Sequence, residues 1–110
     1  MTLAERSGEV LSLGDGSIEE FVETETPVLV EFYTEWCGSC QQMDPILESI
    51  AAETDATVLT VDIEEHLETA IEYGAQSAPT LVLFVDGRPV KQLSGAQTEQ
   101  RLRDLVETDR

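Results

Sequence analysis

Apolar and polar residues follow one another along the chain with two different periods, and these periods predict strands and helices. Residues 28–34 are almost continuously apolar, as expected for a strand that is covered on both faces. Further on, apolar residues recur every three or four positions, which is typical of one face of a long helix. These residues are Cys40, Met43, Leu47, Ile50 and Ala51. Pro45 lies within this helix and is expected to kink it, because proline removes one backbone hydrogen bond.

Shorter apolar patterns predict three more helices. Ser17 and Glu20 have the spacing of a capping box, so a helix is expected to begin at this point. Its apolar face consists of Ile18, Phe21 and Val22. A short helix with Leu67, Ala70 and Ile71 is expected to end at Gly74, and a closing helix buries Leu102, Leu105 and Val106.

Four further strands are predicted, and the last two form a hairpin. They comprise a short strand with Val10, Leu11 and Leu13, and then residues 57–61, 81–85 and 90–93. Asp86-Gly87 is a strong signal for a tight turn between the last two strands. Strands that first alternate with helices and then form a hairpin predict an α/β domain with a mixed central sheet.

The length and composition fit a single small domain. The chain has 110 residues, of which 41% are hydrophobic, so it can bury a core without support from disulfides or metals. We expect residues 9–110 to form the domain and residues 1–8 to be a flexible N-terminal tail.

The charge of the chain is strongly one-sided. Twenty-three acidic residues face six basic ones, which gives a formal net charge of −17, and Lys91 is the only lysine. Such a surface repels phosphate backbones and anionic membranes, so neither nucleic acid nor a membrane is expected as a partner. The excess acid can simply form a solvated shell. It also resembles the surfaces of proteins from salt-loving organisms, in which concentrated salt screens the self-repulsion.

The N-terminal segment predicts a cytoplasmic protein. Glu5 and Arg6 interrupt the region in which a signal peptide would need an apolar core. No apolar run approaches the roughly 18 residues of a membrane helix. Because the cytoplasm keeps thiols reduced, two neighbouring cysteines are more often catalytic or metal-binding there than structural.

The two cysteines, Cys37 and Cys40, lie where the long apolar strand gives way to the long helix. The first turn of a helix offers unpaired N–H groups and the positive end of its dipole, which stabilise a thiolate. Gly38 between them leaves the first sulfur open to a partner.

A structural disulfide would close too short a loop to restrict the unfolded chain much. Zinc needs about four ligands, and the single histidine, His66, is expected to be a distant surface residue of a helix. Thiol–disulfide exchange is therefore the favoured interpretation.

Several motifs at matching separations resemble the thioredoxin family over about residues 9–108. They are Trp36-Cys37-Gly38-Ser39-Cys40, Pro45, Ala78-Pro79-Thr80 and Gly95. The resemblance implies a thioredoxin-like fold with about five strands and about four helices. It also implies that Cys37 is the nucleophile, that Cys40 is the resolving thiol, and that Pro79 is a cis-proline. The substrate is then expected to bind to the backbone of Ala78 as an added strand. The apolar rim around the active sulfur would consist of Trp36, Ala78, Gly95 and Ala96.

The resemblance also places Glu31 where the family has a buried acid behind the resolving cysteine. A carboxyl group removed from water has a raised pKa and can exchange protons near neutrality. Alternatively, Glu31 points to solvent at the edge of the sheet. The sequence departs from the family pattern here, because Glu31 is one methylene longer than the usual aspartate and Thr60 takes the place of a nearby lysine. Ser39 replaces a proline, and its hydroxyl and N–H groups should make the protein less reducing.

The predicted function is reduction of disulfides in client proteins. A separate thioredoxin reductase-type donor is expected to recharge the pair, no bound cofactor or metal is implied, and the protein is expected to be a monomer. With Ser39, the same fold could instead serve as a disulfide isomerase or a mild oxidase. A third alternative is a non-catalytic binding subunit that uses only the apolar rim.

Overall fold

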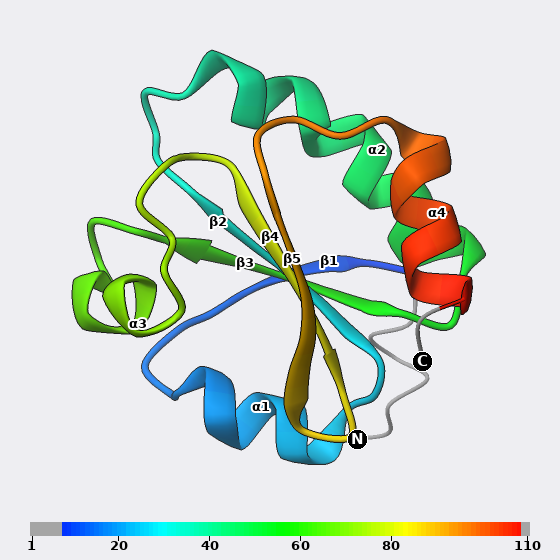
Figure 1. The fold of residues 1–110 in the computed structure, drawn as a ribbon, viewed down its shortest axis with the longest axis horizontal. Helices are drawn as coiled ribbons and strands as arrows, with labels where there is room; N and C mark the ends of the chain where they lie inside the picture. The colour runs from blue at the N-terminus through cyan, green and yellow to red at the C-terminus, as the bar shows by residue number, and fades with distance from the viewer. Residues whose placement is uncertain (1–7, 109–110) are drawn as a thin grey trace.

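A computed structural model describes residues 8–108 as a five-stranded sheet with helices on both faces (Figure 1). The elements in chain order are β1 (Val10–Ser12), α1 (Ile18–Thr24), β2 (Val28–Tyr33), α2 (Gly38–Glu53), β3 (Thr57–Asp62), α3 (Leu67–Glu72), β4 (Thr80–Val85), β5 (Arg88–Ser94) and α4 (Glu99–Thr108). The predicted fold class is confirmed. Apart from Gly8, the predicted tail lies outside the described residues.

The strand that precedes the cysteines is the middle strand of the sheet. The strands lie in the order β1-β3-β2-β4-β5, with β2 parallel to β3 and antiparallel to β4. Because both of its edges are paired and both of its faces are covered, β2 is apolar over nearly its whole length. The sheet is therefore mixed, as the sequence predicts.

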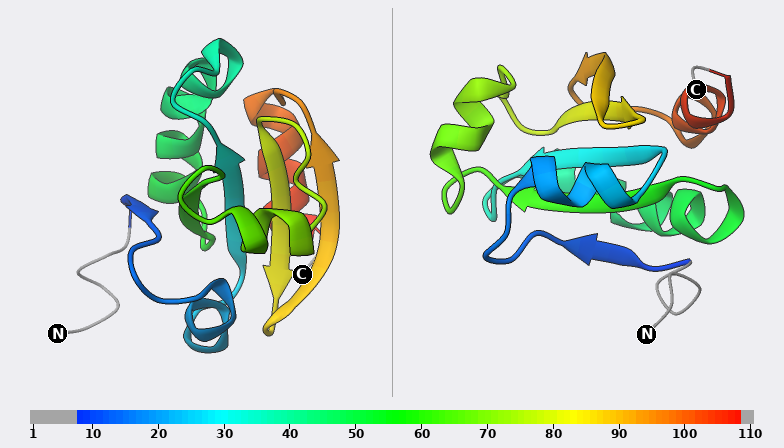
Figure 2. Two further views of the ribbon diagram at one scale, coloured as in Figure 1. Left: turned by 90° about the vertical axis from the view of Figure 1, so that its left-hand side faces the viewer. Right: turned by 90° about the horizontal axis from the view of Figure 1, so that it is seen from below.

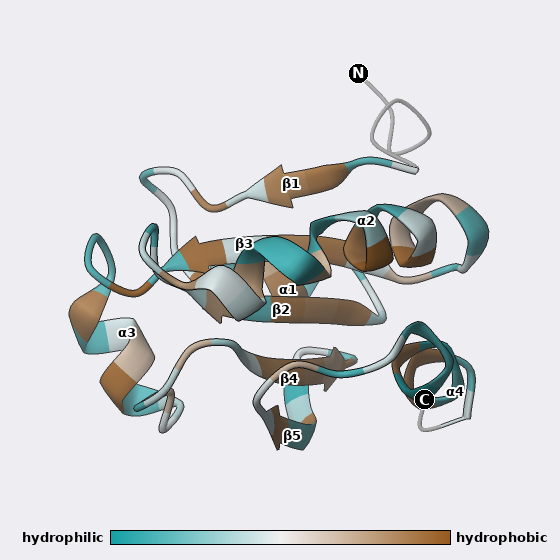
Figure 3. Ribbon diagram, turned by 90° about the horizontal axis from the view of Figure 1, so that it is seen from above, coloured by the Kyte–Doolittle hydropathy of each residue, from teal (hydrophilic) through white to brown (hydrophobic). Residues whose placement is uncertain are grey.

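Two apolar cores form, one on each face of the sheet. Figure 2 shows α1 and α3 on one face, and α2 and α4 on the other. Side chains alternate along a strand, so Val28, Val30 and Phe32 of β2 pack into the core beneath α1 and α3, whereas Leu29 packs beneath α2 and α4. Glu31 shares the face of Leu29 and is thereby directed beneath α2. The central strands are largely hydrophobic, whereas hydrophilic and hydrophobic residues alternate along the helices (Figure 3).

Two short local signals form as predicted. Ser17 caps α1: its hydroxyl accepts the N–H of Glu20 at 3.1 Å, and a carboxylate oxygen of Glu20 accepts the N–H of Ser17 at 3.4 Å. The β4–β5 hairpin turns at Asp86 and Gly87, whose φ angles of 53° and 83° fit a tight hairpin turn. These local contacts fix the entry of α1 and the register of the last two strands.

The structure shifts the three inner strands by one residue at one end and corrects the boundaries of the two edge strands further. Leu13 lies just beyond β1, although its N–H still donates to the carbonyl oxygen of Thr60. The last strand is longer than predicted and begins at Arg88, directly after the turn. Apolar residues mark only the middle of such an edge strand, so its polar ends are not visible as a pattern.

The region of α3 also differs from the prediction. His66 is half-buried at the N-cap of α3 and is not a surface residue within a helix. Ala70 is buried, but Leu67 and Ile71 are exposed, because they lie one turn apart on the opposite side of a helix of six residues. Three apolar positions in so short a helix do not define which side faces the core. No helix within residues 8–108 is long and apolar enough to cross a membrane.

Candidate active site

Cys37 and Cys40 form a disulfide at the N-terminus of α2, with their Cα atoms 5.2 Å apart. Cys37 is the N-cap residue, and its sulfur accepts the backbone N–H of Cys40 at 3.1 Å. Cys37 is half-buried, whereas Cys40 is only 3% exposed. The two sulfurs therefore differ in access: a partner can approach Cys37 from solvent, and Cys40 lies behind it.

The position of Cys37 favours an ionised sulfur once the disulfide is reduced. An N–H group already points at this sulfur, and the remaining unpaired N–H groups of the first turn and the helix dipole act in the same direction. The hydroxyl of Ser39 lies 3.4 Å from the Cys37 sulfur. A thiolate at such a site has a pKa below its ordinary value of about 8.5, and the thiolate is the reactive form.

The segment around Pro79 lies against the cysteine pair. The Ala78–Pro79 peptide bond is cis, as the resemblance implies, and the carbonyl oxygen of Ala78 is 3.5 Å from the Cys37 sulfur. The N–H of Gly95 donates to the carbonyl oxygen of Pro79 at 2.8 Å, which joins the end of β5 to the same segment. Thr80 is buried, and its hydroxyl donates to the carbonyl oxygen of Ser77 at 2.6 Å. Residues far apart in the sequence thus form one surface beside Cys37.

The remaining predicted rim residues differ in exposure. Trp36 is 84% exposed, Gly38 and Ala96 are also exposed, and Gly95 is half-buried. Gly95 has a φ of +87°, a conformation that residues with a side chain rarely adopt. A large exposed indole next to a reactive sulfur is an available contact surface, because nothing in the described chain covers it.

Glu31 is buried beneath α2, so the alternative of a solvent-facing residue at a sheet edge is wrong. Glu31 is 2% exposed, and its Oε2 makes no hydrogen bond with any described residue. Val30 and Phe32 do point to the opposite face, but helices cover that face as well. Thr60, which stands where the resemblance has a lysine, is the direct partner of Glu31 on β3.

Burial raises the pKa of Glu31 from 4.5 to about 7, and the negative charge of Asp44 contributes in the same direction. The folded state therefore holds this proton more tightly than the unfolded chain does. Its contribution to stability is complete below pH 4.5 and is lost as the pH rises to about 7. The difference between these two pKa values corresponds to about 3 kcal/mol.

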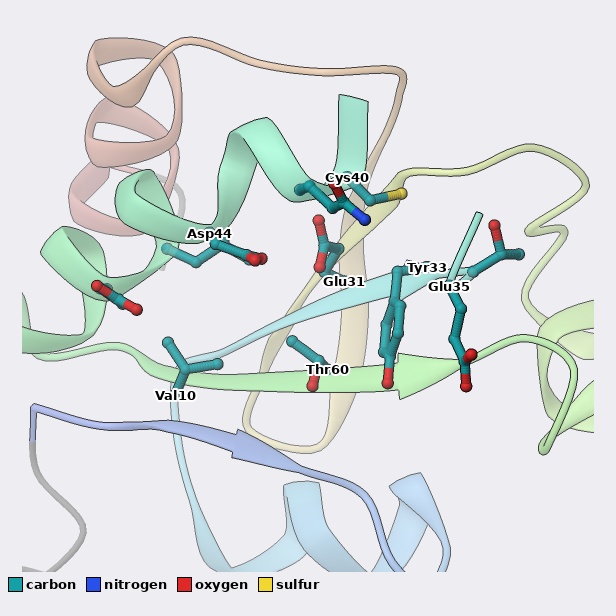
Figure 4. A pocket seen from close by; sticks show the side chains of 11 residues that line it. Val10, Glu31, Tyr33, Glu35, Cys40, Asp44 and Thr60 are labelled. Carbon is teal, nitrogen blue, oxygen red and sulfur yellow. The ribbon is translucent and has the colours of Figure 1, made fainter. Parts of the chain in front are cut away.

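A cavity of about 410 Å³ connects Glu31 and Cys40 to the surface (Figure 4). Figure 4 shows the carboxylate of Glu31 extending from β2 toward the first turn of α2. The residues that line the cavity are Val10, Glu31, Tyr33, Thr34, Glu35, Cys40, Gln41, Asp44, Leu47, Glu48 and Thr60. Of these described residues, none is basic. Within residues 8–108, no group of three or more His, Cys, Asp or Glu side chains could hold a metal ion.

The sequence interpretation missed both the cavity and Asp44. The available signal was the spacing: Asp44 follows Cys40 by four residues in an amphipathic helix and so lies on the same side. The Cys37–Cys40 pair can therefore take up and release two electrons, and Glu31, in the same cavity as Cys40, can take up and release a proton.

Comparisons with known proteins agree with this geometry. A sequence profile of the Thioredoxin family matches residues 9–108. A thioredoxin from Alicyclobacillus acidocaldarius is 43% identical over 94 residues, which cover 84% of this chain and 90% of the relative. A bifunctional thioredoxin reductase/thioredoxin from Mycobacterium leprae is 38% identical over 109 residues, covering 96% of this chain and 24% of that longer protein.

Solved structures show the same likeness. A mutant thioredoxin from Halobacterium salinarum superimposes with a TM-score of 0.88 at 39% identity, covering 92% of this chain and 90% of that one. The profile match extends over nearly all of the described chain and includes both cysteines. The chain therefore belongs to the thioredoxin family of thiol–disulfide oxidoreductases, with Cys37 and Cys40 as its redox pair.

Proposed function

We propose that the protein reduces disulfides of client proteins, with Cys37 as the nucleophile and Cys40 as the resolving thiol. The Cys37 thiolate attacks one sulfur of the client disulfide, forms a mixed disulfide and releases the other client sulfur as a thiolate. Cys40 loses its proton and attacks the Cys37 sulfur. The second client thiolate then leaves, the Cys37–Cys40 disulfide forms, and two electrons have passed to the client.

The observation that carries this assignment is the difference in access between the two sulfurs. Cys37 is half-buried at the helix N-cap, and Cys40 is 3% exposed one turn inside the helix. Only the accessible sulfur can meet a disulfide on another protein. The buried one is placed to displace the client once a mixed disulfide has formed.

Glu31 is proposed to accept the proton of Cys40 during this second attack and to return it in the reverse reaction. The two residues line the same cavity, and one oxygen of the carboxyl group, Oε2, is buried without a hydrogen-bond partner among the described residues. With a pKa of about 7, Glu31 changes protonation state near neutral pH, where a general acid–base group is most useful. In this proposal the proton passes from Cys40 to Glu31 through the cavity beneath the first turn of α2.

The client is proposed to bind along the surface beside Cys37. The backbone of Ala78 lies next to the sulfur, so an extended client segment can pair with it as an added strand. Trp36, Gly95 and Ala96 supply the apolar rim. Pro79 and Thr80 hold this backbone through the bond from Gly95 and the bond to Ser77.

The family implies disulfide-containing targets and a thioredoxin reductase as electron donor. We propose that this donor is a separate protein in the cytoplasm and that the chain acts as a monomer. The net charge of −17 favours protein partners that complement an acidic surface and disfavours nucleic acid and anionic membranes.

The reduction potential distinguishes a reductase from an isomerase or a mild oxidase on the same fold. We expect equilibration with glutathione buffers to give a value closer to about −270 mV, typical of thioredoxin, than to about −180 mV, typical of an isomerase. The Ser39 hydroxyl stabilises the Cys37 thiolate, so Ser39→Ala should give a more reducing protein. A value near about −180 mV would contradict the reductase assignment. A binding subunit would instead keep its activity after both cysteines are replaced.

The acidic surface predicts stability that depends strongly on salt. Only six basic residues offset 23 acidic ones, so self-repulsion is large at low ionic strength and is screened as salt is added. We expect the melting temperature to rise steeply from low to molar potassium chloride. An equal melting temperature at both concentrations would contradict adaptation to high salt and favour an ordinary solvated acidic shell.

A further inference from the structure

Asp44 and Cys40 lie one turn apart on α2, and both line the cavity that contains the buried end of Glu31. Asp44 is exposed, whereas Glu31 is 2% exposed. In Figure 4 the two carboxylates lie on the same side of the first turns of α2, with Glu31 beneath Cys40 and Asp44 beside it. Asp44 is therefore a solvent-exposed carboxylate in the same cavity as the buried acid.

No positive charge among the other described residues of the cavity opposes the negative charge of Asp44. The charged residues of the cavity are Asp44 and Glu48 of α2 and Glu35 of the loop after β2, and Tyr33 of β2 adds an uncharged phenol. Cys40 of α2 lies there as well, and β1, β3 and β4 contribute the uncharged residues Val10, Thr60 and Leu81. No basic residue is among these described neighbours. The charge that acts on Glu31 in addition to burial is that of Asp44.

We propose that Asp44 is a positioning residue for the exchange reaction: its carboxylate at the cavity mouth holds the proton on Glu31 and so sets the pH range in which Cys40 can be deprotonated. Asp44 touches neither the client nor the sulfurs and acts only through Glu31. The inference rests on the proposed role of Glu31 as proton acceptor. Without Asp44, Glu31 loses its proton at lower pH and is ionised in a larger fraction of molecules under mildly acidic conditions.

The test compares two variants that remove the same charge from the same face of α2. Asp44→Asn should lower the titration midpoint of the Glu31 carboxyl carbon, followed by ¹³C NMR in the oxidised protein, by about half a pH unit, or about threefold in proton affinity. Glu48→Gln removes the same charge from the same cavity but should shift the midpoint much less, because Glu48 lies one turn further along α2 from Cys40 than Asp44 does. Asp44→Glu keeps the charge and should leave the midpoint nearly unchanged.

The second readout is the pH profile of mixed-disulfide release. In Asp44→Asn its acidic limb should move to lower pH by the same amount, so that release at about pH 6 is about threefold faster than in the unaltered protein. Equal midpoints for Asp44→Asn and Glu48→Gln would show that Asp44 has no particular effect on Glu31. This result would overturn the proposal and leave the role of Glu31 intact. A lower titration midpoint of Glu31 in Asp44→Asn, without a matching change in mixed-disulfide release, would also overturn the proposal. Glu31 would then not be the proton acceptor of the reaction.

Discussion

Replacing Cys37 with serine is expected to reduce turnover of a protein disulfide to the background rate, whereas Cys40→Ser should stop the reaction after the first exchange. A serine hydroxyl stays protonated at neutral pH and does not attack disulfides, so the first variant has no nucleophile. The second variant keeps the Cys37 thiolate but has no thiol to displace the client. Non-reducing electrophoresis and mass spectrometry should therefore show a stable one-to-one adduct at Cys37 only in Cys40→Ser.

The matched control is the variant with serine at both positions, which should form no adduct but fold normally. Cys40 is 3% exposed, so its sulfur in Cys37→Ser should react with a client far more slowly than the Cys37 sulfur does in Cys40→Ser. Equal amounts of adduct in the two single variants would contradict the assignment of Cys37 as the nucleophile. Release of the adduct by added dithiothreitol would verify that the bond is a disulfide.

The order of elements could be predicted because local signals and tertiary packing agree along most of the chain. Residues 28–34 are apolar because β2 is covered on both faces, and the capping box and Asp86-Gly87 turn are set by neighbouring residues alone. The prediction was weakest in α3, where the helix is short and only Ala70 reaches the core. In such a segment, tertiary packing decides which apolar residue is buried.

The sulfurs of the candidate site could be predicted from the residues themselves, whereas the buried position of Glu31 was implied only by the family resemblance and the effect of Asp44 was missed. Cys37 and Cys40 are close in sequence, so their spacing alone places them in one helical turn. The alternation along β2 does not say whether Glu31 faces water, because that depends on whether α2 covers its face. The effect of Asp44 on Glu31 depends on the shape of a cavity, and a sequence pattern carries no information about a cavity.

Glu31→Gln is expected to slow release of the mixed disulfide by about 10² or more while changing its formation much less. Formation needs only the Cys37 thiolate, which lies at the helix N-cap outside the cavity. Release needs Cys40, which is 3% exposed, to lose its proton, and glutamine cannot accept that proton. Rapid-mixing experiments with a chromogenic disulfide, followed by release of the second product, measure the two steps separately. At high pH the defect should diminish, because hydroxide can then remove the proton of Cys40 directly.

The stability of the same variant separates a chemical role of Glu31 from a structural one. Glutamine resembles the protonated acid, so at about pH 5 the two proteins should unfold in urea with similar free energies. As the pH rises from 4.5 to about 7, Glu31 ionises in the unfolded chain but stays protonated in the folded protein, so the unaltered protein loses stability and Glu31→Gln does not. By about pH 8 Glu31→Gln should therefore be more stable by up to about 3 kcal/mol. If Glu31→Gln is more stable at this pH and yet releases its client more slowly, damage to the fold does not explain the slower release. Equal slowing of both steps, together with lower stability at the same pH, would instead make Glu31 a structural residue of the α2 face.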